Sequence, residues 1–354
     1  MSGTDGRRRR SALVVPAALL ALAGCAELPG WSSGPGSRGT PAPATAAVPS
    51  SAPDHPPGER NAAEGATGLA ASQRLARFDA ALAPEVSGIA VSRTVPDRVY
   101  MVDDDLGLFL LDLDSGALHH LAVTTSDGAT PGGADVEDVT VGPCGPQDAS
   151  SCIYVGDIGD NRRRRDAVEV WRLSEPAEPP PAAAVADVVR LVYPDGPQDA
   201  EALLVDDAGT PMIVTKAPFD ERSGSTGPTR VLRAPGFADG ALDDLGELAL
   251  PPPSSALFAG FVGNVVTAAD RAGDRVLLRT YDSVLLLEPF QGGGADLAEL
   301  ARWPVREVAG APVLPQAEAV ALLPDGAGYL TVSEGVGEVW QGALPAPAPA
   351  GPPR

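Results

Sequence analysis

The sequence contains few of the residues on which enzymes most often depend for nucleophilic or metal chemistry. Histidine and cysteine occur three times each, and residues 73–344 contain no Gly-x-Ser-x-Gly motif, phosphate-binding loop or pair of histidines at metal-ligand spacing. His119 and His120 are neighbours, so on a strand they would point to opposite faces. These absences argue against a serine hydrolase, an ATPase and a zinc enzyme. Ligands for haem or copper are lacking too, so we expect no nucleotide, haem or zinc.

Positive charge is scarce as well. The chain has 26 Lys and Arg against 47 Asp and Glu, and Lys216 is its only lysine. The formal net charge of −21 becomes −24 once residues 1–24, with their four arginines and one aspartate, are removed. Nucleic-acid binding needs a basic patch, and anionic membrane surfaces attract basic segments. The composition therefore predicts no nucleic-acid partner and no membrane binding through the protein surface itself.

The N-terminus is organised like a bacterial export signal. Arg7 to Arg10 form a positive segment, and the uncharged residues 11–24 are fewer than the roughly 20 apolar residues of a membrane-spanning helix. The segment ends in Leu22-Ala23-Gly24-Cys25, which resembles the bacterial lipobox. The resemblance implies cleavage after Gly24 and lipid on the Cys25 thiol, with two or more acyl chains that make the anchor stable. An ordinary secretory signal with an accidental cysteine is the alternative.

Composition divides the rest of the chain into three parts. Residues 25–72 are rich in Pro, Gly, Ser and Ala and predict a disordered linker, and residues 345–354 predict a similar tail, which leaves 73–344 as the folded domain. We expect Cys144 and Cys152 to form a disulfide, because they belong to an exported protein and flank a turn-rich stretch. The expected location is the extracytoplasmic face of the cell membrane.

Short apolar runs recur within residues 73–344, separated by Gly, Pro and Asp turns. Four of them open on or near a glutamate, with separations of 52, 64 and 117 residues between Glu85, Glu137, Glu201 and Glu318. A fifth run fits the long gap and has Asn264 in place of glutamate. A second apolar strand follows each run, at residues 99–102, 153–156, 212–215, 276–279 and 329–332. Repeats of about 50 residues with about four strands each are typical of a β-propeller.

The two ends of the repeat array complement each other. The last repeat lacks a fourth strand, and residues 74–79 precede the first one. We predict an all-β fold, a β-propeller of five blades in which the N-terminal strand completes the last blade. A sixth blade within residues 201–264 is the alternative.

Propeller geometry predicts where the acidic residues of these repeats meet. The first strand of each blade lines the central channel, and its start lies on the same face as the end of the second strand. Carboxylates from several blades are therefore expected at one mouth of the channel: Glu85, Asp135, Glu137, Asp199, Glu201 and Glu318 from first strands, and Asp103, Asp104, Asp105, Asp157, Asp160, Asp282 and Glu334 from second strands. Like charges at short range raise each other's pKa, and a calcium ion is the natural compensator. Alternatively, the repeated glutamates accept backbone hydrogen bonds from a neighbouring blade and lock the blades together.

Two further features lie near this expected mouth. A metal loop or a tight turn would suit the stretch Gly156-Asp157-Ile158-Gly159-Asp160-Asn161. The four arginines that follow it either neutralise the acidic residues or form a solvated loop. Lys216 either contacts a phosphate or carboxylate of a substrate or neutralises the ring of acids.

Four short segments resemble the blade pattern of calcium-dependent propellers, namely Glu85-Val86-Ser87-Gly88, Asp135-Val136-Glu137-Asp138, Asp199-Ala200-Glu201-Ala202 and Gln316-Ala317-Glu318-Ala319. That group includes the β-propeller phytases, esterase-like phytase-related proteins and gluconolactonase-like proteins. The resemblance implies Glu137, Asp157, Glu201 and Glu318 as calcium ligands and Lys216 or Arg279 as a phosphate contact. Asp160 and Glu85 complete the candidate metal set.

Two hypotheses about function follow. The leading one is a lipid-anchored propeller that binds a small-molecule ligand or a partner protein, with or without a structural cation. The alternative is a calcium-dependent hydrolase of phosphate esters or lactones, so the sequence leaves open whether the chain is an enzyme. Metal-dependent turnover that disappears in Glu137→Gln or Asp157→Asn while the fold survives would distinguish the two.

Overall fold

The computed structural model describes residues 72–346, except 106, 134, 177–182, 221–222, 224, 254–263 and 291–294. The predicted signal peptide, the lipid site at Cys25 and the end of the Pro/Ala tail lie outside these residues. Within the described part, strands dominate and the one α- or 3-10 element with defined bounds is the 3-10 turn η2, Leu297–Arg302. No helix in this part is long and apolar enough to cross a membrane.

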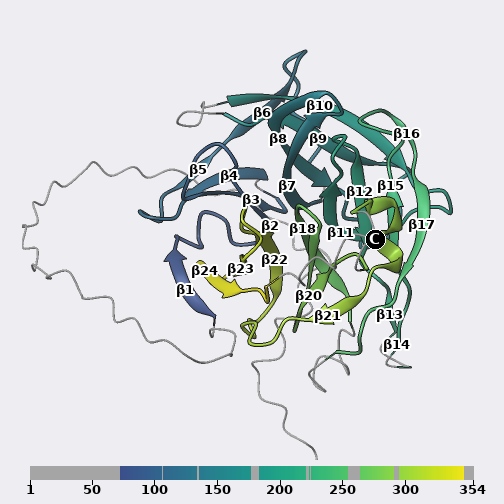
Figure 1. The fold of residues 1–354 in the computed structure, drawn as a ribbon. Helices are drawn as coiled ribbons and strands as arrows, with labels where there is room; N and C mark the ends of the chain where they lie inside the picture. Colours follow the sequence, from purple (N-terminus) through teal and green to yellow (C-terminus); the bar gives the residue numbers. More distant parts are fainter. Residues whose placement is uncertain are drawn as a thin grey trace, which may run out of the picture. The chain divides into compact units, whose positions relative to one another are not determined.

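The strands form five blades of a propeller, as predicted (Figure 1). Blade 1 contains β2 (Val86–Val91), β3 (Arg98–Asp103), β4 (Gly107–Asp112) and β5 (Leu118–His120). Blade 2 contains β7 (Val136–Gly145), β8 (Asp148–Asp157), β9 (Val168–Ser174) and β10 (Ala183–Val192). Blade 3 contains β11 (Ala200–Val205), β12 (Pro211–Thr215), β15 (Thr229–Arg233) and β17 (Asp243–Leu248). Blade 4 contains β18 (Val266–Ala272), β19 (Arg275–Thr280), β20 (Val284–Leu287) and β21 (Val305–Glu307).

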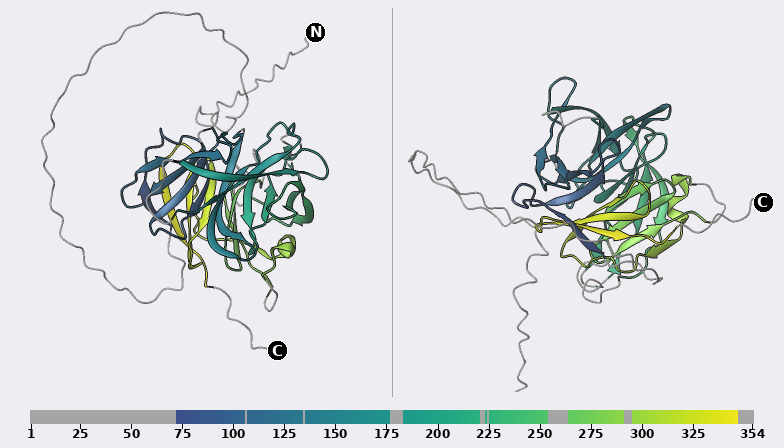
Figure 2. Two further views of the ribbon diagram at one scale, coloured as in Figure 1. Left: turned by 90° about the horizontal axis from the view of Figure 1, so that it is seen from above. Right: turned by 60° about the vertical axis from the view of Figure 1, so that its left-hand side comes forward.

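Blade 5 joins the two ends of the domain. It contains β22 (Ala317–Leu322), β23 (Gly328–Ser333), β24 (Glu338–Ala343) and, on its outer edge, the N-terminal strand β1 (Gln73–Arg77). β1 lies antiparallel to β24, with Gln73 opposite Gln341, and Figures 1 and 2 show it beside the last strand of the chain. Arg74 and Arg77 both donate to Glu338 across this pair. The predicted closure of the propeller is therefore confirmed.

Short additional strands extend the blades. β6 (Ala122–Thr125) and β16 (Gly240–Ala241) both pair in parallel with β10, so chain segments from blades 1 and 3 are tied to the outer edge of blade 2. β13 (Phe219–Asp220) and β14 (Ser225–Thr226) form a small separate hairpin.

The hydrophobic core lies between the blades. The described residues contain five clusters of buried apolar side chains, and each one fills the interface between two adjacent blades. Successive residues of one strand serve opposite interfaces: Leu203 packs toward blade 2 and Leu204 toward blade 4. Both faces of an inner strand are therefore buried, which explains why these strands are mostly apolar and do not alternate apolar with exposed polar residues.

The predicted disulfide is present. Cys144 and Cys152 are bonded and join β7 to β8 near the hairpin that connects them. Closing a loop of this size stabilises the folded state by about 2.5 kcal/mol through the entropy of the unfolded chain. We expect the double variant Cys144→Ser/Cys152→Ser to lose about that much unfolding free energy, measured by urea titration. An unchanged urea midpoint in both the variant and the reduced wild type would contradict this.

Candidate functional site: the acidic mouth of the propeller

Each inner strand carries a β-bulge near its start. The register with the second strand shifts by one residue at this place in all five blades, so that one inner-strand residue is left unpaired. The bulged residues are Ser87, Glu137, Glu201, Thr267 and Glu318. A bulge re-aims the side chain that it releases from the ladder. The repeating feature of the sequence is therefore a bulge position, which three blades fill with glutamate.

This register corrects the predicted alignment in two blades. Glu85 and Asn264 were aligned with the repeated glutamates, but Ser87 and Thr267 occupy the equivalent position. The Ser87 hydroxyl donates to the carbonyl of Val136 at 3.0 Å, and the Thr267 hydroxyl donates to the carbonyl of Ala317 at 3.1 Å. Blades 1 and 4 thus use this position to bind the next blade. Spacing alone missed this because Glu85 lies two positions, and Asn264 three positions, before the bulged residue of its own blade.

The three bulge glutamates meet acids from neighbouring blades at one mouth of the channel. We call the set Asp104, Asp135, Glu137, Glu201 and Glu318 the acidic mouth. Burial raises the pKa of Glu201 to about 7, of Asp104 to about 8, of Glu318 to about 9 and of Asp135 to about 6. Acids of the set add to the first three shifts, and Asp199 and Asp157 add to that of Asp135. Burial, then the charges of Glu201 and Asp104, raise the pKa of Glu137 well above its usual value. The predicted convergence of acids from several blades is therefore present.

Lys216 is the cation at the centre of this set. Its ammonium donates to Glu201 Oε1 and lies 5.7 Å from the ring centroid of Tyr281. Burial alone would lower the pKa of Lys216, but Glu201, Tyr281 and Glu137 raise it well above its usual value. Of the two roles considered for Lys216, the geometry supports neutralisation of the acids. Tyr281 gave no signal in the repeat pattern, because it lies in the turn after β19.

The second-strand acids of blades 1 and 2 support the start of the inner strand. Asp103 Oδ2 accepts from the backbone N–H of Glu85 at 2.9 Å, and Asp157 Oδ1 accepts from that of Asp135 at 3.0 Å. Asp157 also pairs with the guanidinium of Arg165 at 2.7 Å. Arg165, one of the four consecutive arginines, therefore neutralises an acidic residue near the mouth.

The remaining candidate residues lie at the edge of the mouth or away from it. Asp160 is occupied in its own loop, where its carboxylate accepts from the backbone N–H groups of Arg164 and Arg165. Burial and the charges of Asp105 and Asp103 raise the pKa of Glu85. Arg279 is completely buried, reaches the carbonyl of Pro312 at 3.3 Å, and has its pKa lowered to about 10 by burial. It therefore presents no guanidinium to a ligand in this structure.

An aspartate fills the centre of the propeller directly below the mouth. Asp138 follows the bulge of β7, and its Oδ2 accepts from the N–H groups of Leu203 in blade 3 at 2.8 Å and Ala269 in blade 4 at 3.2 Å. In blade 1 the backbone of Asp138 lies so close to Gly88 that a Cβ there would be 2.6 Å from its Cα. The side chain of Asp138 thus joins blade 2 to blades 3 and 4, and its backbone packs closely against blade 1. The expected lock between blades exists, but Asp138 provides it rather than the glutamate beside it.

A second buried aspartate repeats this arrangement farther along the channel. Asp270 on β18 accepts from the Thr140 hydroxyl at 3.0 Å and from the N–H of Leu322 at 2.7 Å. It therefore connects blade 4 to blades 2 and 5. Asp270 lies in the middle of an inner strand, where the sequence reasoning looked only for apolar residues.

The proposed calcium ligands do not form a preformed coordination site. Asp157 and Glu201 are each paired with a cation of the protein, Arg165 and Lys216 respectively. In the described part of the chain, no three His, Cys, Asp or Glu side chains converge as metal ligands would. Asp104 Oδ1, Asp157 Oδ2 and Glu201 Oε2 are nevertheless buried without a hydrogen-bond partner. These carboxylates thus do not fit preformed calcium coordination, but the three unpaired oxygens can still accept hydrogen bonds.

Comparisons with known proteins find only distant structural similarity. The sequence matches no family model, and a search of curated proteins finds no significant match. The chain is a five-bladed β-propeller. It is similar to the PQQ-bound aldose sugar dehydrogenase of Streptomyces coelicolor, with 9% identity over 78% of this chain and 98% of that one and a TM-score of 0.42. A Xanthomonas campestris gluconolactonase shares 14% identity over 73% and 72% of the two chains, with a TM-score of 0.41. A glucose dehydrogenase shares 13% over 77% and 99%, with a TM-score of 0.43.

Proposed function

We propose that this propeller is a binding module whose acidic mouth takes up the cationic group of a ligand or partner protein. The observation that carries the proposal is the set of buried carboxylate oxygens without partners, Asp104 Oδ1, Asp157 Oδ2 and Glu201 Oε2, which come from three different blades. A buried acceptor left unpaired costs about 1–3 kcal/mol. An ammonium or guanidinium group brings several donors and a compensating charge at once.

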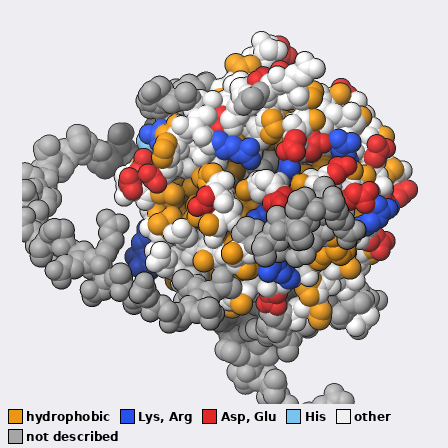
Figure 3. Space-filling view, in the orientation of Figure 1, with side chains coloured by type: hydrophobic (Ala, Val, Ile, Leu, Met, Phe, Trp, Pro, Cys, Tyr) orange, Lys and Arg blue, Asp and Glu red, His pale blue; other side chains and the backbone are white. Residues whose placement is uncertain are grey.

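The charge balance of the mouth supports a cation rather than an anion. Five carboxyl groups surround one ammonium, and the raised pKa values of Asp104 and Glu201 show that each added negative charge is costly there. On the face seen in Figure 3, by contrast, acidic and basic side chains are interspersed.

The test is calorimetric titration of the chain carrying Cys25→Ser with spermidine and, separately, with calcium. We expect saturable spermidine binding that raises the melting temperature and becomes at least tenfold weaker in Glu137→Gln. Asp187→Asn is the matched control, because Asp187 is an exposed acid paired with Arg172 on the outside of blade 2. No saturable spermidine binding, or equal weakening by the control, would refute the proposal.

A calcium-dependent hydrolase of phosphate esters or lactones is the second candidate. The carboxyl groups of Glu201 and Asp104, with pKa values of about 7 and 8, are in the range that suits a general acid or base near neutral pH. Saturable calcium binding together with turnover of a phosphomonoester or of gluconolactone would favour this candidate. That turnover should disappear in Glu201→Gln while the melting curve keeps its shape.

We also propose that the propeller is lipid-anchored through Cys25 on the extracytoplasmic face of the cell membrane. The Cys144–Cys152 disulfide supports this location, because such bonds persist in oxidising compartments. We expect radiolabelled palmitate to enter the wild-type chain and not Cys25→Ser, and only the wild type to remain with membranes after a high-salt wash. Labelling of both forms would contradict the proposal.

A further inference from the structure

A cavity of about 320 Å³ lies between blades 1 and 2, next to the acidic mouth. Its wall comes from the turn between β3 and β4, from residues 120–124 and from the segment that leads into β7. Leu108, Leu121 and Val136 belong to its apolar lining, and all three are almost completely buried. Sites for small organic molecules have volumes of this order and linings of this kind.

Asp104 belongs both to this cavity and to the acidic mouth. It lines the cavity beside Asp105, and burial, together with the charges of Glu201 and Asp135 in the mouth, raises its pKa to about 8. Its Oδ1 atom is buried and accepts no hydrogen bond. The described residues that line the cavity include two aspartates and no lysine or arginine, so the wall itself supplies no basic side chain to Asp104. A cation beside Asp104 would favour its ionised form, whereas an anion would add to the repulsion.

Trp171 on β9 provides an aromatic wall for the same cavity. The residue is only 4% exposed, and its indole Nε1 is buried without a hydrogen-bond partner. Buried polar groups without a partner are uncommon in folded proteins. An aromatic ring packs well against other rings, and its face attracts cations. The lining therefore suits an organic cation with an aromatic body.

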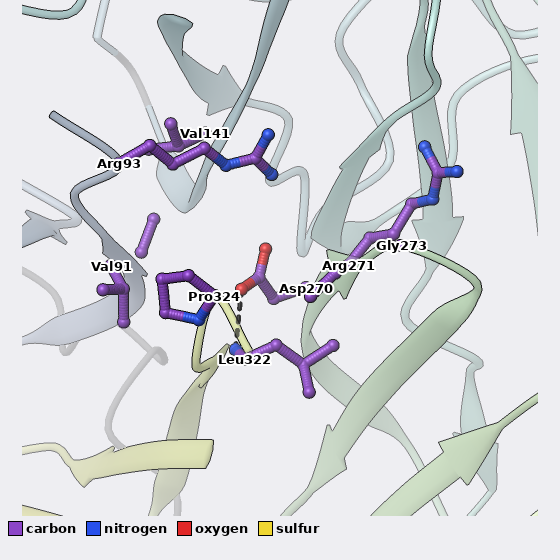
Figure 4. Close-up of a pocket in the computed structure, with 10 residues that line it drawn as sticks. Val91, Arg93, Val141, Asp270, Arg271, Gly273, Leu322 and Pro324 are labelled. Carbon is purple, nitrogen blue, oxygen red and sulfur yellow. Dashed lines mark hydrogen bonds between the residues drawn. The ribbon is translucent and has the colours of Figure 1, made fainter. Parts of the chain in front are cut away.

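The cavity around Asp270, at the far ends of the inner strands, has no such spare acceptor. Oδ1 of Asp270 accepts from the Thr140 hydroxyl, and Oδ2 accepts from the N–H of Leu322, the bond drawn in Figure 4. Both oxygens of Asp270 thus serve the fold. The unpaired carboxylate oxygen beside an apolar cavity lies instead at the mouth, on Asp104.

We infer that the ligand of the acidic mouth is a primary ammonium ion with a small aromatic body, its ammonium group at Asp104 and its ring in the cavity between blades 1 and 2. This inference rests on the proposed function, because it assumes that the mouth takes up a cation. A primary ammonium brings three N–H donors and the charge that Asp104 lacks as a partner. The apolar walls and Trp171 would cover the ring, as in most small-molecule sites, where a few polar groups orient a largely apolar molecule.

The experiment is calorimetric titration of the chain carrying Cys25→Ser with tyramine, and with ethylamine and spermidine as comparisons. Tyramine and ethylamine each carry one ammonium group, so the difference between them measures what the cavity contributes. We expect tyramine to bind at least tenfold more tightly than ethylamine, because only tyramine has a ring to place there. Asp104→Asn, which keeps the shape of the side chain, should weaken tyramine binding at least tenfold.

Gly133→Val tests the cavity without changing an acid. A Cβ at Gly133 would lie 3.4 Å from Cη2 of Trp171 and 3.5 Å from Cγ2 of Val136, so it fits without a clash. The added methyl groups would then take up space in the cavity that Gly133 lines. We expect tyramine binding to become at least tenfold weaker and spermidine binding to stay unchanged. Gly145→Val is the matched control, because a Cβ there would meet nothing within 4 Å and Gly145 does not line the cavity.

Three results would overturn the inference. The first is equal affinity for tyramine and ethylamine, and the second is tyramine binding that Asp104→Asn leaves unchanged. The third is tyramine binding that Gly133→Val weakens no more than Gly145→Val does. If spermidine binds while tyramine shows no advantage over ethylamine, only this inference fails. If spermidine does not bind either, the proposed function fails with it.

Discussion

Replacing Asp138 by alanine is expected to lower the unfolding free energy by about 4 kcal/mol, because it orphans the buried N–H groups of Leu203 and Ala269 and opens a space at the centre of the propeller. For a domain of this size the melting temperature should fall by roughly 8–16 °C. Asparagine should cost less, since its single amide oxygen can still accept both interblade bonds. Urea titration of the three chains measures the order wild type, asparagine, alanine.

The matched control for this prediction is Asp187→Ala. Asp187 is also an aspartate on a strand, but it is exposed and pairs only with Arg172 at 2.9 Å. Its loss should change stability by less than about 0.5 kcal/mol. Similar effects of the two alanine variants would show that Asp138 does not hold the blades together.

The propeller is expected to become less stable as the pH rises from 5.5 to 8.5. Carboxyl groups in an unfolded chain lose their protons near pH 4, whereas the folded state keeps protons on Glu201, Asp104 and Glu318 up to about pH 7, 8 and 9. Between these limits the folded state binds more protons than the unfolded state, so stability falls with rising pH. Each such proton contributes about 1.4 kcal/mol per pH unit, and because the groups share one cluster we expect a total loss of roughly 3–6 kcal/mol.

Other ionisable groups do not reverse this trend. Asp206 and Glu338 have lowered pKa values, so their contribution to stability is complete above about pH 4.5 and is lost only on acidification. Lys216 remains charged throughout, because its pKa is raised. Glu318→Gln should make the pH dependence shallower and raise stability at pH 8.5. Chemical denaturation at several pH values is the measurement, and a constant or rising stability across this range would contradict the prediction.

Much of the fold could be predicted from the chain alone. After their opening glutamates, the runs at 201–205 and 318–322 are apolar at every position, and together with the run at 137–141 they recur with turns at the spacing of propeller blades. The missing last strand and the unpaired segment at residues 74–79 predicted the closure that β1 and β24 form. Local propensity and counting suffice for these features, because each blade is a contiguous segment of sequence.

The candidate site was predicted in part. Propeller geometry correctly brought Glu137, Glu201, Glu318 and Lys216 to one mouth, since strand direction alone decides which end a residue occupies. It did not identify the bulges, because one extra residue in a strand leaves no mark on the spacing of apolar runs. Glu85 was therefore aligned with a position that Ser87 fills.

Five blades, with a sixth as the alternative, the disulfide and the end of the channel at which the acids gather could all be predicted from local order along the chain. Contacts between blades, which form only in the folded chain, set which carboxylate oxygens are hydrogen-bonded and which remain unpaired. Asp138 and Glu137 are adjacent and chemically alike, yet Asp138 accepts hydrogen bonds from two other blades and Glu137 faces the mouth. Their roles differ because the groups that surround each carboxylate come largely from other blades: Leu203 and Ala269 donate to Asp138, whereas Glu201 and Asp104 crowd Glu137.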